Sequence, residues 1–250
     1  MMEDITKNRL LVISGNAFSN TGNNGKTIYS FIDFLPEDNV RQLYFRTETP
    51  EINGYDYYSL SDKAVLSRWY NKKSTGTIYS QNNIITKEKS KDGGNSTKRF
   101  WGVKRNSFTC LIREAIWHNH WLSRELLEWL DDFSPTCIFY VAGDAWFPYE
   151  ICRFIKERYN AKLSVYITDD YILPRRKESI IDKTYRKGTL KRLKSILSVT
   201  DNFFTVSDMM QRTYKEVLGV DSIPIANMTD SLKTNTGRDQ KNAITIVYAG

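Results

Sequence analysis

The chain has 250 residues, of which 40% are hydrophobic and 26% charged, and it carries a formal net charge of +7. These values are ordinary for a soluble globular protein with a sizeable core. No run approaches the roughly 20 apolar residues that a membrane span needs, and the polar start has no apolar signal segment.

The three cysteines, Cys110, Cys137 and Cys152, are odd in number and have no C-x-x-C spacing. They are expected to be small core residues in a reducing compartment, because neither a disulfide framework nor a metal site fits this pattern. With no predicted span or signal segment, the sequence indicates a cytoplasmic protein.

The first ordered stretch runs from Leu10 to Leu35. An apolar run predicts a buried strand, a loop of small residues follows, and apolar spacing of i, i+3, i+4 and i+7 up to Leu35 predicts a helix. Such a loop before a helix N-terminus favours anions, because free backbone N–H groups and the helix dipole point into it. Gly25-Lys26-Thr27 suggests a P-loop, but the first glycine of that motif is due where the chain has Asn20. The sequence therefore predicts a looser anion-binding loop.

Strands and helices then alternate along the chain. Further strands are predicted at 40–45, 136–142, 163–167, 202–206 and 222–226, and helices at 62–70, 107–133, 147–159, 179–199 and 208–218. This alternation predicts an α/β fold with a doubly wound parallel sheet of Rossmann type.

Composition divides the chain into one domain and a tail. Residues 71–107 are rich in Lys, Ser, Asn and Gly and are expected to form a flexible basic insertion in a domain spanning 1–228. A polar linker at 229–242 precedes an apolar strand at 243–250, which cannot bury itself alone. We therefore expect the chain to stop at the first strand of a second domain.

Positive charge gathers in two segments. Residues 72–107 hold nine Lys and Arg against two Asp and Glu, and residues 175–194 hold the same numbers. An anionic surface is the expected partner, and segments that simply face water are the alternative. The apolar residues within 175–194 fit packing on the sheet or resting on an anionic membrane. Nucleic acid is disfavoured, because few aromatic side chains for base stacking lie there.

Polar residues follow the predicted strands at the points where they end. They are Ser14 to Gly25, Arg46, Gly143-Asp144, Asp169-Asp170-Tyr171, Ser207-Asp208 and Asn227. Each alone is explained by a cap or a turn, but the carboxyl ends of parallel strands share one edge, so together they predict a polar ligand site.

Metal binding is not expected at either group of candidate ligands. Asp169 and Asp170 point opposite ways on extended backbone, so one of them is expected to accept hydrogen bonds from sugar hydroxyls or from a backbone N–H. A helix cap is the alternative for this pair. His118 and His120, the only histidines, point about 200° apart on a helix and cannot chelate one ion, which excludes zinc and nuclease functions.

Five stretches carry a family resemblance. They are ISGNAFSNTGNNGKT, QLYFRTETP, the pair FYVAGDAWFP and VYITDDYI, FFTVSDMMQRTYKEVLG, and ITIVYAG after the linker. In this order they resemble the N-terminal domain of the GT-B glycosyltransferases of family four, the bacterial enzymes that build capsule, O-antigen and exopolysaccharide.

The resemblance implies one half of a two-domain GT-B architecture. It implies that the N-terminal domain binds a glycan or polyprenyl-linked acceptor and that a C-terminal domain binds the nucleotide-sugar donor. It further implies retaining transfer at the inner face of the plasma membrane, with no bound metal, no cofactor beyond the donor and no nucleic acid.

Site residues follow from the same resemblance. It assigns donor phosphate binding to Gly22, Gly25 and Lys26, and the floor of the cleft to Ser207 and Asn227. It assigns the acceptor side to Asp144, Asp169, Asp170 and Tyr171. The donor-binding glutamates belong to the missing domain, so no catalytic residue is identified and residues 1–250 alone are expected to be inactive.

Two other functions stay open at this point. One is a nucleotide-binding ATPase or kinase-like domain that uses Gly25-Lys26-Thr27. The other is a non-catalytic module that binds polyanions through the basic segments.

Overall fold

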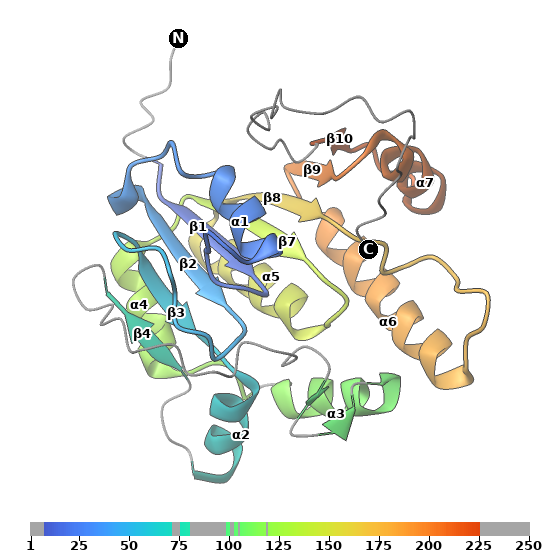
Figure 1. Ribbon diagram of the computed structural model, residues 1–250, viewed down its shortest axis with the longest axis horizontal. Coiled ribbons are helices and arrows are strands. Elements are labelled where there is room, and N and C mark those ends of the chain that lie inside the picture. The colour runs from blue at the N-terminus through green and yellow to red at the C-terminus, as the bar shows by residue number, and fades with distance from the viewer. Residues whose placement is uncertain are drawn as a thin grey trace, which may run out of the picture.

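A computed structural model describes residues 8–71, 76–80, 99–100, 103–104, 106–118 and 120–225 (Figure 1). The predicted linker at 229–242, the predicted strand at 243–250 and Asn227 lie outside these residues. Most of the predicted insertion at 71–107 lies outside them as well. The predicted domain boundaries therefore stay predictions.

The described residues form an eight-stranded sheet and a small hairpin. The sheet has the order β10-β9-β8-β7-β1-β2-β3-β4, and neighbouring strands are parallel except β3 with β4. Its strands are Leu10–Ser14 (β1), Val40–Tyr44 (β2), Asp56–Ser59 (β3), Thr77–Tyr79 (β4), Cys137–Ala142 (β7), Lys162–Ile167 (β8), Asn202–Thr205 (β9) and Ile223–Pro224 (β10). The hairpin pairs Arg99–Phe100 (β5) with Val103–Lys104 (β6). The predicted doubly wound, mostly parallel α/β sheet is confirmed.

The sheet grows in opposite directions on the two sides of β1. β2 and β3 follow β1 outward on one side, whereas β7 pairs with β1 on the other side and β8, β9 and β10 continue from there. The loops that leave β1 and β7 therefore part from each other. A crevice at the carboxyl ends of these two strands is the position where doubly wound sheets bind ligands.

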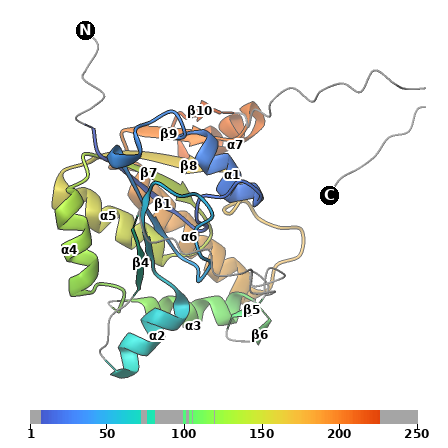
Figure 2. The same cartoon turned by 60° about the vertical axis from the view of Figure 1, so that its left-hand side comes forward.

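Helices cover both faces of the sheet, and Figure 2 shows α1 on one face with α4 and α5 on the other. The helices are Asn23–Ser30 (α1), Asp62–Asn71 (α2), Ser107–Trp117 (α3), Arg124–Phe133 (α4), Phe147–Tyr159 (α5), Ile180–Leu197 (α6) and Asp208–Leu218 (α7), with a 3-10 turn at Glu37–Asn39 (η2). Val12 of β1 packs in the cluster that holds Ile28 of α1, whereas Leu11 and Ile13 pack in the cluster that holds α4 and α5. Because both faces are buried, the strand is apolar without alternation.

The prediction of one helix over 107–133 is wrong. α3 ends at Trp117, where His118 leaves the helical conformation with ψ 119°, and α4 begins after Ser123. The Ser123 hydroxyl accepts a hydrogen bond from the backbone N–H of Leu126 at 3.1 Å, which caps the new helix. The apolar stripe concealed this break because it continues from one helix to the next.

Two further differences from the predicted elements concern β4 and the end of α1. β4 is an antiparallel edge strand inside the stretch expected to be an insertion, and its Thr-Ile-Tyr sequence has high β propensity. α1 ends at Ser30, before the predicted Leu35, and the chain continues in tighter turns with Ile32 buried.

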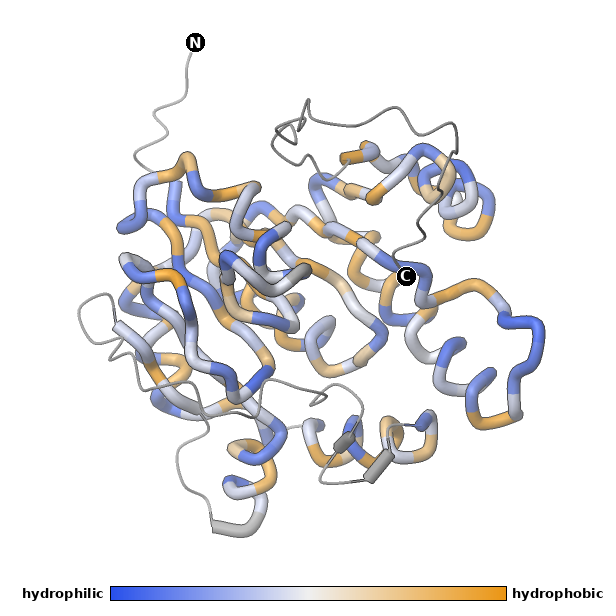
Figure 3. The backbone as a smooth tube through the Cα atoms, viewed as in Figure 1, coloured by the Kyte–Doolittle hydropathy of each residue, from blue (hydrophilic) through white to orange (hydrophobic). Residues whose placement is uncertain are grey.

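The two helices at the C-terminal side match their predictions. α6 begins with a capping box between Ser179 and Asp182. Ser207 caps the start of α7 and Gly219 caps its end, where a φ of 71° suits a glycine. Figure 3 shows the hydrophilic loop before α6 and the apolar first turn that follows it. None of the described helices is both long and apolar enough to cross a membrane.

Candidate functional site

A cavity of about 760 Å³ lies at the crevice between the loops that follow β1 and β7, and we call it the switch-point cavity. Gly15 and Asn16 line it from β1, and Gly143 and Asp144 line it from β7. A Cβ atom added at Gly15 or Gly143 would meet nothing within 4 Å, so both backbones face open space. The predicted ligand edge of the sheet therefore holds a real cavity.

Acidic and basic side chains come mostly from different parts of the switch-point cavity, although Arg175 follows β8 as the aspartates do and Asp62 precedes Lys63. The loops after β7 and β8 contribute Asp144, Asp169 and Asp170, which form its acidic side. The opposite basic side consists of Arg46 after β2, Lys63 at the start of α2, and Arg113 on α3. A ligand that fits both sides carries hydrogen-bond donors at one end and negative charge at the other.

The predicted acceptor-side residues meet in this cavity. Asp144, Asp169, Asp170 and Tyr171 all line it. One carboxylate oxygen of Asp170 accepts hydrogen bonds from the backbone N–H groups of Ile172 and Leu173 at 3.0 Å each, so this residue also caps its own turn. The sequence left open whether one of the two aspartates accepts hydrogen bonds from backbone N–H groups, and Asp170 is the one that does.

Asp169 has a different environment. It is exposed, and its Oδ2 accepts a hydrogen bond from the Tyr171 hydroxyl at 3.2 Å. Burial raises the pKa of Tyr171, and the nearby Asp169 carboxylate raises it further. The phenol therefore stays protonated at physiological pH and serves as a hydrogen-bond donor beside a carboxylate acceptor.

The basic side is held in place by a contact between helices. Arg113 Nε and Trp117 Nε1 of α3 both donate to Asp62 Oδ1 of α2, each at 2.7 Å. The guanidinium of Arg113 also lies 4.6 Å from the ring centroid of Phe147. Lys63 next to Asp62 is exposed and has no carboxylate partner among the described residues. Lys63 was not predicted because the strand before it, β3, was not predicted either, and Arg113 was not predicted because it lies on a helix.

The predicted donor-phosphate residues lie beside the switch-point cavity without lining it. Gly22, Gly25 and Lys26 are absent from its lining, which takes Asn24 and Ile28 from α1 instead. Lys26 is exposed. The role assigned to these three residues stays a prediction.

Side chains already fill much of the loop before α1. The Ser19 hydroxyl accepts hydrogen bonds from the backbone N–H groups of Thr21 at 3.0 Å and Gly22 at 2.7 Å. Ser19 in turn donates to Glu51 Oε2 at 2.7 Å, and Glu48 Oε1 accepts from the N–H of Ala17 at 2.8 Å. Two carboxylates therefore sit where a phosphate would need positive potential.

Gly25 has a packing reason to be glycine. A Cβ atom there would lie 2.4 Å from the carbonyl oxygen of Ala17 and 2.9 Å from the Cβ of Ser19. Real Cβ atoms do not approach backbone oxygen this closely. The close approach of α1 to its own preceding loop thus explains this glycine without a ligand.

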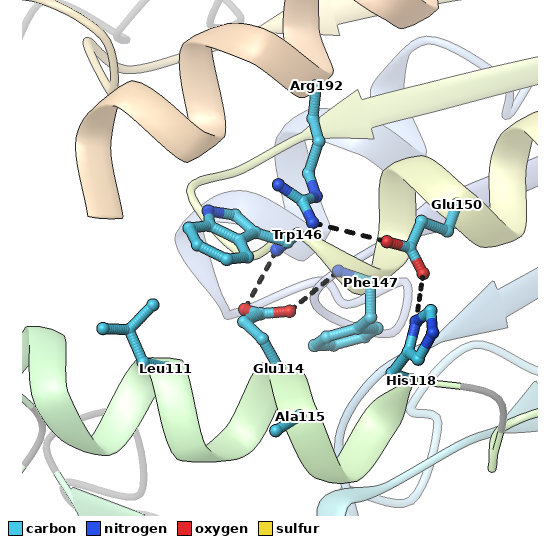
Figure 4. A pocket seen from close by; sticks show the side chains of 8 residues that line it. All are labelled: Leu111, Glu114, Ala115, His118, Trp146, Phe147, Glu150 and Arg192. Atoms are coloured by element: carbon cyan, nitrogen blue, oxygen red, sulfur yellow. Dashed lines mark hydrogen bonds and ion pairs between the residues drawn. The ribbon is translucent and has the colours of Figure 1, made fainter. Parts of the chain in front are cut away.

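A second cavity of about 330 Å³ lies between α3, α5 and α6, and Figure 4 shows its lining. Its buried carboxylate, Glu114, accepts hydrogen bonds from the backbone N–H groups of Trp146 at 3.0 Å and Phe147 at 2.9 Å. The Tyr185 hydroxyl donates to the same carboxylate at 3.1 Å. Since α5 has no cap of its own, Glu114 caps it from α3, while burial raises the pKa of Glu114.

The loop that carries Asp144 is tied to α6. The Thr189 hydroxyl of α6 donates to the backbone oxygen of Asp144 at 2.9 Å and accepts from Trp146 Nε1 at 3.0 Å. The indole of Trp146 stacks on Tyr185, and the guanidinium of Arg192 lies 4.1 Å from its centroid. These contacts fix the acidic side of the switch-point cavity against α6.

The two histidines have different partners. His118 Nδ1 lies 3.6 Å from Glu150 Oε2, in the cavity between α3 and α5, while His120 Nδ1 lies 2.7 Å from the backbone oxygen of His118. Within the part of the chain that the structure describes, no three His, Cys, Asp or Glu side chains are placed to hold a metal ion.

Of the two predicted cleft-floor residues, Ser207 is the one that the structure describes. Ser207 caps α7, where its hydroxyl accepts from the N–H of Met210 at 3.2 Å, and it lines neither cavity. Asn227 lies outside the described residues.

A scan against protein-family models and a search of curated proteins each find no match to this chain.

Proposed function

We propose that the protein is a glycosyltransferase and that the described domain binds its acceptor. The transfer would take a sugar from a nucleotide-sugar donor to a glycan or a polyprenyl-linked sugar, in the synthesis of a cell-surface polysaccharide. The observation that carries the proposal is the switch-point cavity, with its acidic side of three aspartates and its basic side of Arg46, Lys63 and Arg113.

The acidic side suits a sugar. Sugar hydroxyls donate hydrogen bonds to carboxylates, and hydrogen bonds to a charged group are stronger than neutral ones. The Tyr171 hydroxyl donates to Asp169 at 3.2 Å, so the carboxylate and the phenol oxygen together can accept hydrogen bonds from two neighbouring sugar hydroxyls. The predicted roles of Asp144, Asp169, Asp170 and Tyr171 gain support from their common cavity.

The basic side suits a phosphate attached to that sugar. Lys63 is exposed and has no carboxylate partner in the described residues, whereas Arg113 is held by Asp62 at 2.7 Å. A polyprenyl-linked acceptor carries its phosphate next to the sugar, so the separation of charges in the cavity fits such a molecule. The reaction is placed in the cytoplasm as part of the same proposal, at the inner face of the plasma membrane.

The ATPase or kinase alternative has less support. It relies on Gly25-Lys26-Thr27, yet these residues do not line the switch-point cavity. The N–H groups that would hold a phosphate are bonded to Ser19 in part, and Glu51 lies against the same loop.

Binding of small probes tests the proposal. Calorimetric titrations with glucose 1-phosphate, glucose and inorganic phosphate separate the two sides of the cavity. We expect Asp169→Asn to weaken glucose 1-phosphate and glucose by about 10-fold, and Lys63→Gln to weaken glucose 1-phosphate and phosphate by about 10-fold. Asp208→Asn and Lys162→Gln, at exposed positions outside the cavity, serve as matched controls.

The transfer itself is tested on the protein as the cell produces it. Radiolabelled nucleotide sugars are incubated with that protein and a lipid extract, and the label that enters the lipid or glycan fraction is counted. Asp169→Asn should reduce this incorporation while Asp208→Asn does not. Binding of ATP that disappears in Lys26→Ala, with no binding of sugar phosphate, would overturn the proposal in favour of a nucleotide-binding domain.

A further inference from the structure

One face of α6 is a row of exposed lysines. Lys183, Lys187, Lys191 and Lys194 are spaced by four, four and three residues, so they lie on one face of the helix, and we call them the lysine stripe. All four are exposed and none pairs with a carboxylate in the described part of the chain. The opposite face is the buried one, with Tyr185, Thr189, Leu193 and Ile196.

The acidic residues of this region do not neutralise the lysine stripe. Glu178 pairs with Arg186 at 2.7 Å, in a contact where both side chains are mostly buried. Asp182 accepts from the Ser179 hydroxyl at 2.8 Å and from Ser107 of α3. The loop before α6 adds Arg175, Arg176 and Lys177, all exposed. The outer surface is therefore strongly positive.

Apolar side chains stand exposed at the end of this basic surface. Ile180 is 86% exposed and Phe108 is 58% exposed, with Ile112 and Ile181 each above 40%. The hydrogen bond between Ser107 and Asp182 joins the N-termini of α3 and α6, so these four residues lie around one point. We call them the α3–α6 tip, and Figure 3 shows its orange first turn of α6 beside the blue loop.

We propose that the α3–α6 tip and the lysine stripe dock on an anionic phospholipid membrane. Lysines and arginines are attracted to the lipid phosphates, and the exposed isoleucine and phenylalanine side chains enter the acyl region. A nucleic acid would satisfy the lysines but leave Ile180, Ile181 and Ile112 in water, and Phe108 is the one exposed aromatic side chain that the described residues of the tip offer for base stacking. The combination of positive charge and exposed branched aliphatic side chains favours an anionic lipid membrane as the partner of this surface.

The docking surface adjoins the switch-point cavity. Arg175 lines that cavity and also belongs to the basic loop before α6. A membrane held by the tip would therefore lie next to the cavity entrance, where a lipid-linked sugar could reach the acidic side. This last step rests on the proposed function, whereas docking on lipid does not depend on it.

Vesicle sedimentation tests the docking without any sugar. The chain is mixed with vesicles of phosphatidylcholine alone or with added phosphatidylglycerol, at about 0.1 M and about 1 M salt. We expect binding to the anionic vesicles only, a loss of about five-fold per lysine in Lys183→Gln and Lys187→Gln, and a loss of about 10-fold in Ile180→Ser. Lys162→Gln and Phe34→Ser, which change an exposed lysine and a 76% exposed phenylalanine elsewhere, should bind as the wild type does.

Other outcomes overturn the proposal. Equal binding to neutral and anionic vesicles would contradict the proposal that this surface docks on anionic lipid. Binding of Ile180→Ser to anionic vesicles that equals the binding of the wild type would contradict it as well. Tight binding of duplex DNA that falls with the lysine variants but not with Ile180→Ser would assign the surface to nucleic acid. Thermal unfolding of each variant checks that the fold is intact. Because no sugar is present, a failure here leaves the glucose 1-phosphate titrations to judge the proposed function.

Discussion

Gly25→Ala is the substitution that most directly separates a packing role from a phosphate-binding role in the first loop. The added methyl group would lie 2.4 Å from the carbonyl oxygen of Ala17 and 2.9 Å from the Cβ of Ser19. An ordinary contact needs about 1 Å more. Either α1 or the loop before it must therefore move.

The size of the effect follows from two opposing terms. Overpacking a tight site costs about 1–3 kcal/mol, and here the obstacle is a backbone oxygen that cannot rotate away. Alanine gains up to about 1 kcal/mol over glycine in a helix, and less at the third residue of α1, where the helix has only begun. We expect a net loss of about 1–2 kcal/mol, which lowers the Tm of a chain of this size by about 2–8 °C.

Urea unfolding followed by circular dichroism measures this loss, with Gly15→Ala as the matched control. A Cβ at Gly15 meets nothing within 4 Å, so that variant should unfold within about 0.5 kcal/mol of the wild type. Lys26→Ala, at an exposed position, should also leave stability unchanged. A fully stable Gly25→Ala protein that has lost a bound nucleotide would refute the packing argument and restore the phosphate-binding loop.

Three further predictions concern Gly188 of α6, Glu114 of α3, which caps α5, and Ser207, which caps α7. Gly188→Ala should destabilise the protein by about 1–3 kcal/mol in urea unfolding despite its better helix propensity, because its Cβ would lie 2.1 Å from the Trp146 ring; a stabilised variant would contradict this. Burial raises the pKa of Glu114 above the ordinary 4.5, so the folded state binds that proton more tightly than the unfolded state. The unfolding free energy of the wild type should therefore fall, relative to Glu114→Gln, as the pH rises from 4.5 through the folded pKa; a difference that stays constant across a pH series of urea titrations would refute this sign. Ser207→Ala removes the cap of α7 and should cost about 1 kcal/mol in the same assay, whereas no change would show that water replaces the hydroxyl without loss.

Local patterns predicted much of the fold. The apolar run of β1 and the Ser207 cap of α7 each depend on neighbours a few residues away, and both lie where the sequence predicted them. The break between α3 and α4 was missed because Ile116 and Leu122 both pack against the same core, so the apolar pattern carries through the turn. β4 was missed because its three residues stand in a stretch rich in Lys, Ser, Asn and Gly, whose composition predicted an insertion.

The site was predictable only on one side. Asp144, Asp169 and Tyr171 follow central strands, and the parallel order of those strands brings them together. Arg113 lines the cavity from a helix, and its hydrogen bond to Asp62 holds it there. These two residues are 51 positions apart, so no local sequence pattern predicts their contact. Gly25 shows the converse limit. Glycine is required equally by a phosphate loop and by a close backbone contact, and the sequence alone does not reveal the contact with the Ala17 oxygen.

Thr189 gives α6 a second role besides packing. Its one hydroxyl holds the backbone of Asp144 on one side and the Trp146 indole on the other, in the middle of the helix whose outer face carries the lysine stripe. The acidic side of the cavity is therefore hydrogen-bonded to α6, the same helix that is proposed to lie on lipid. An α6 resting on headgroups would set the height of Asp144 above the bilayer, so the depth to which the helix sinks would select how long a lipid-linked sugar must be to reach it.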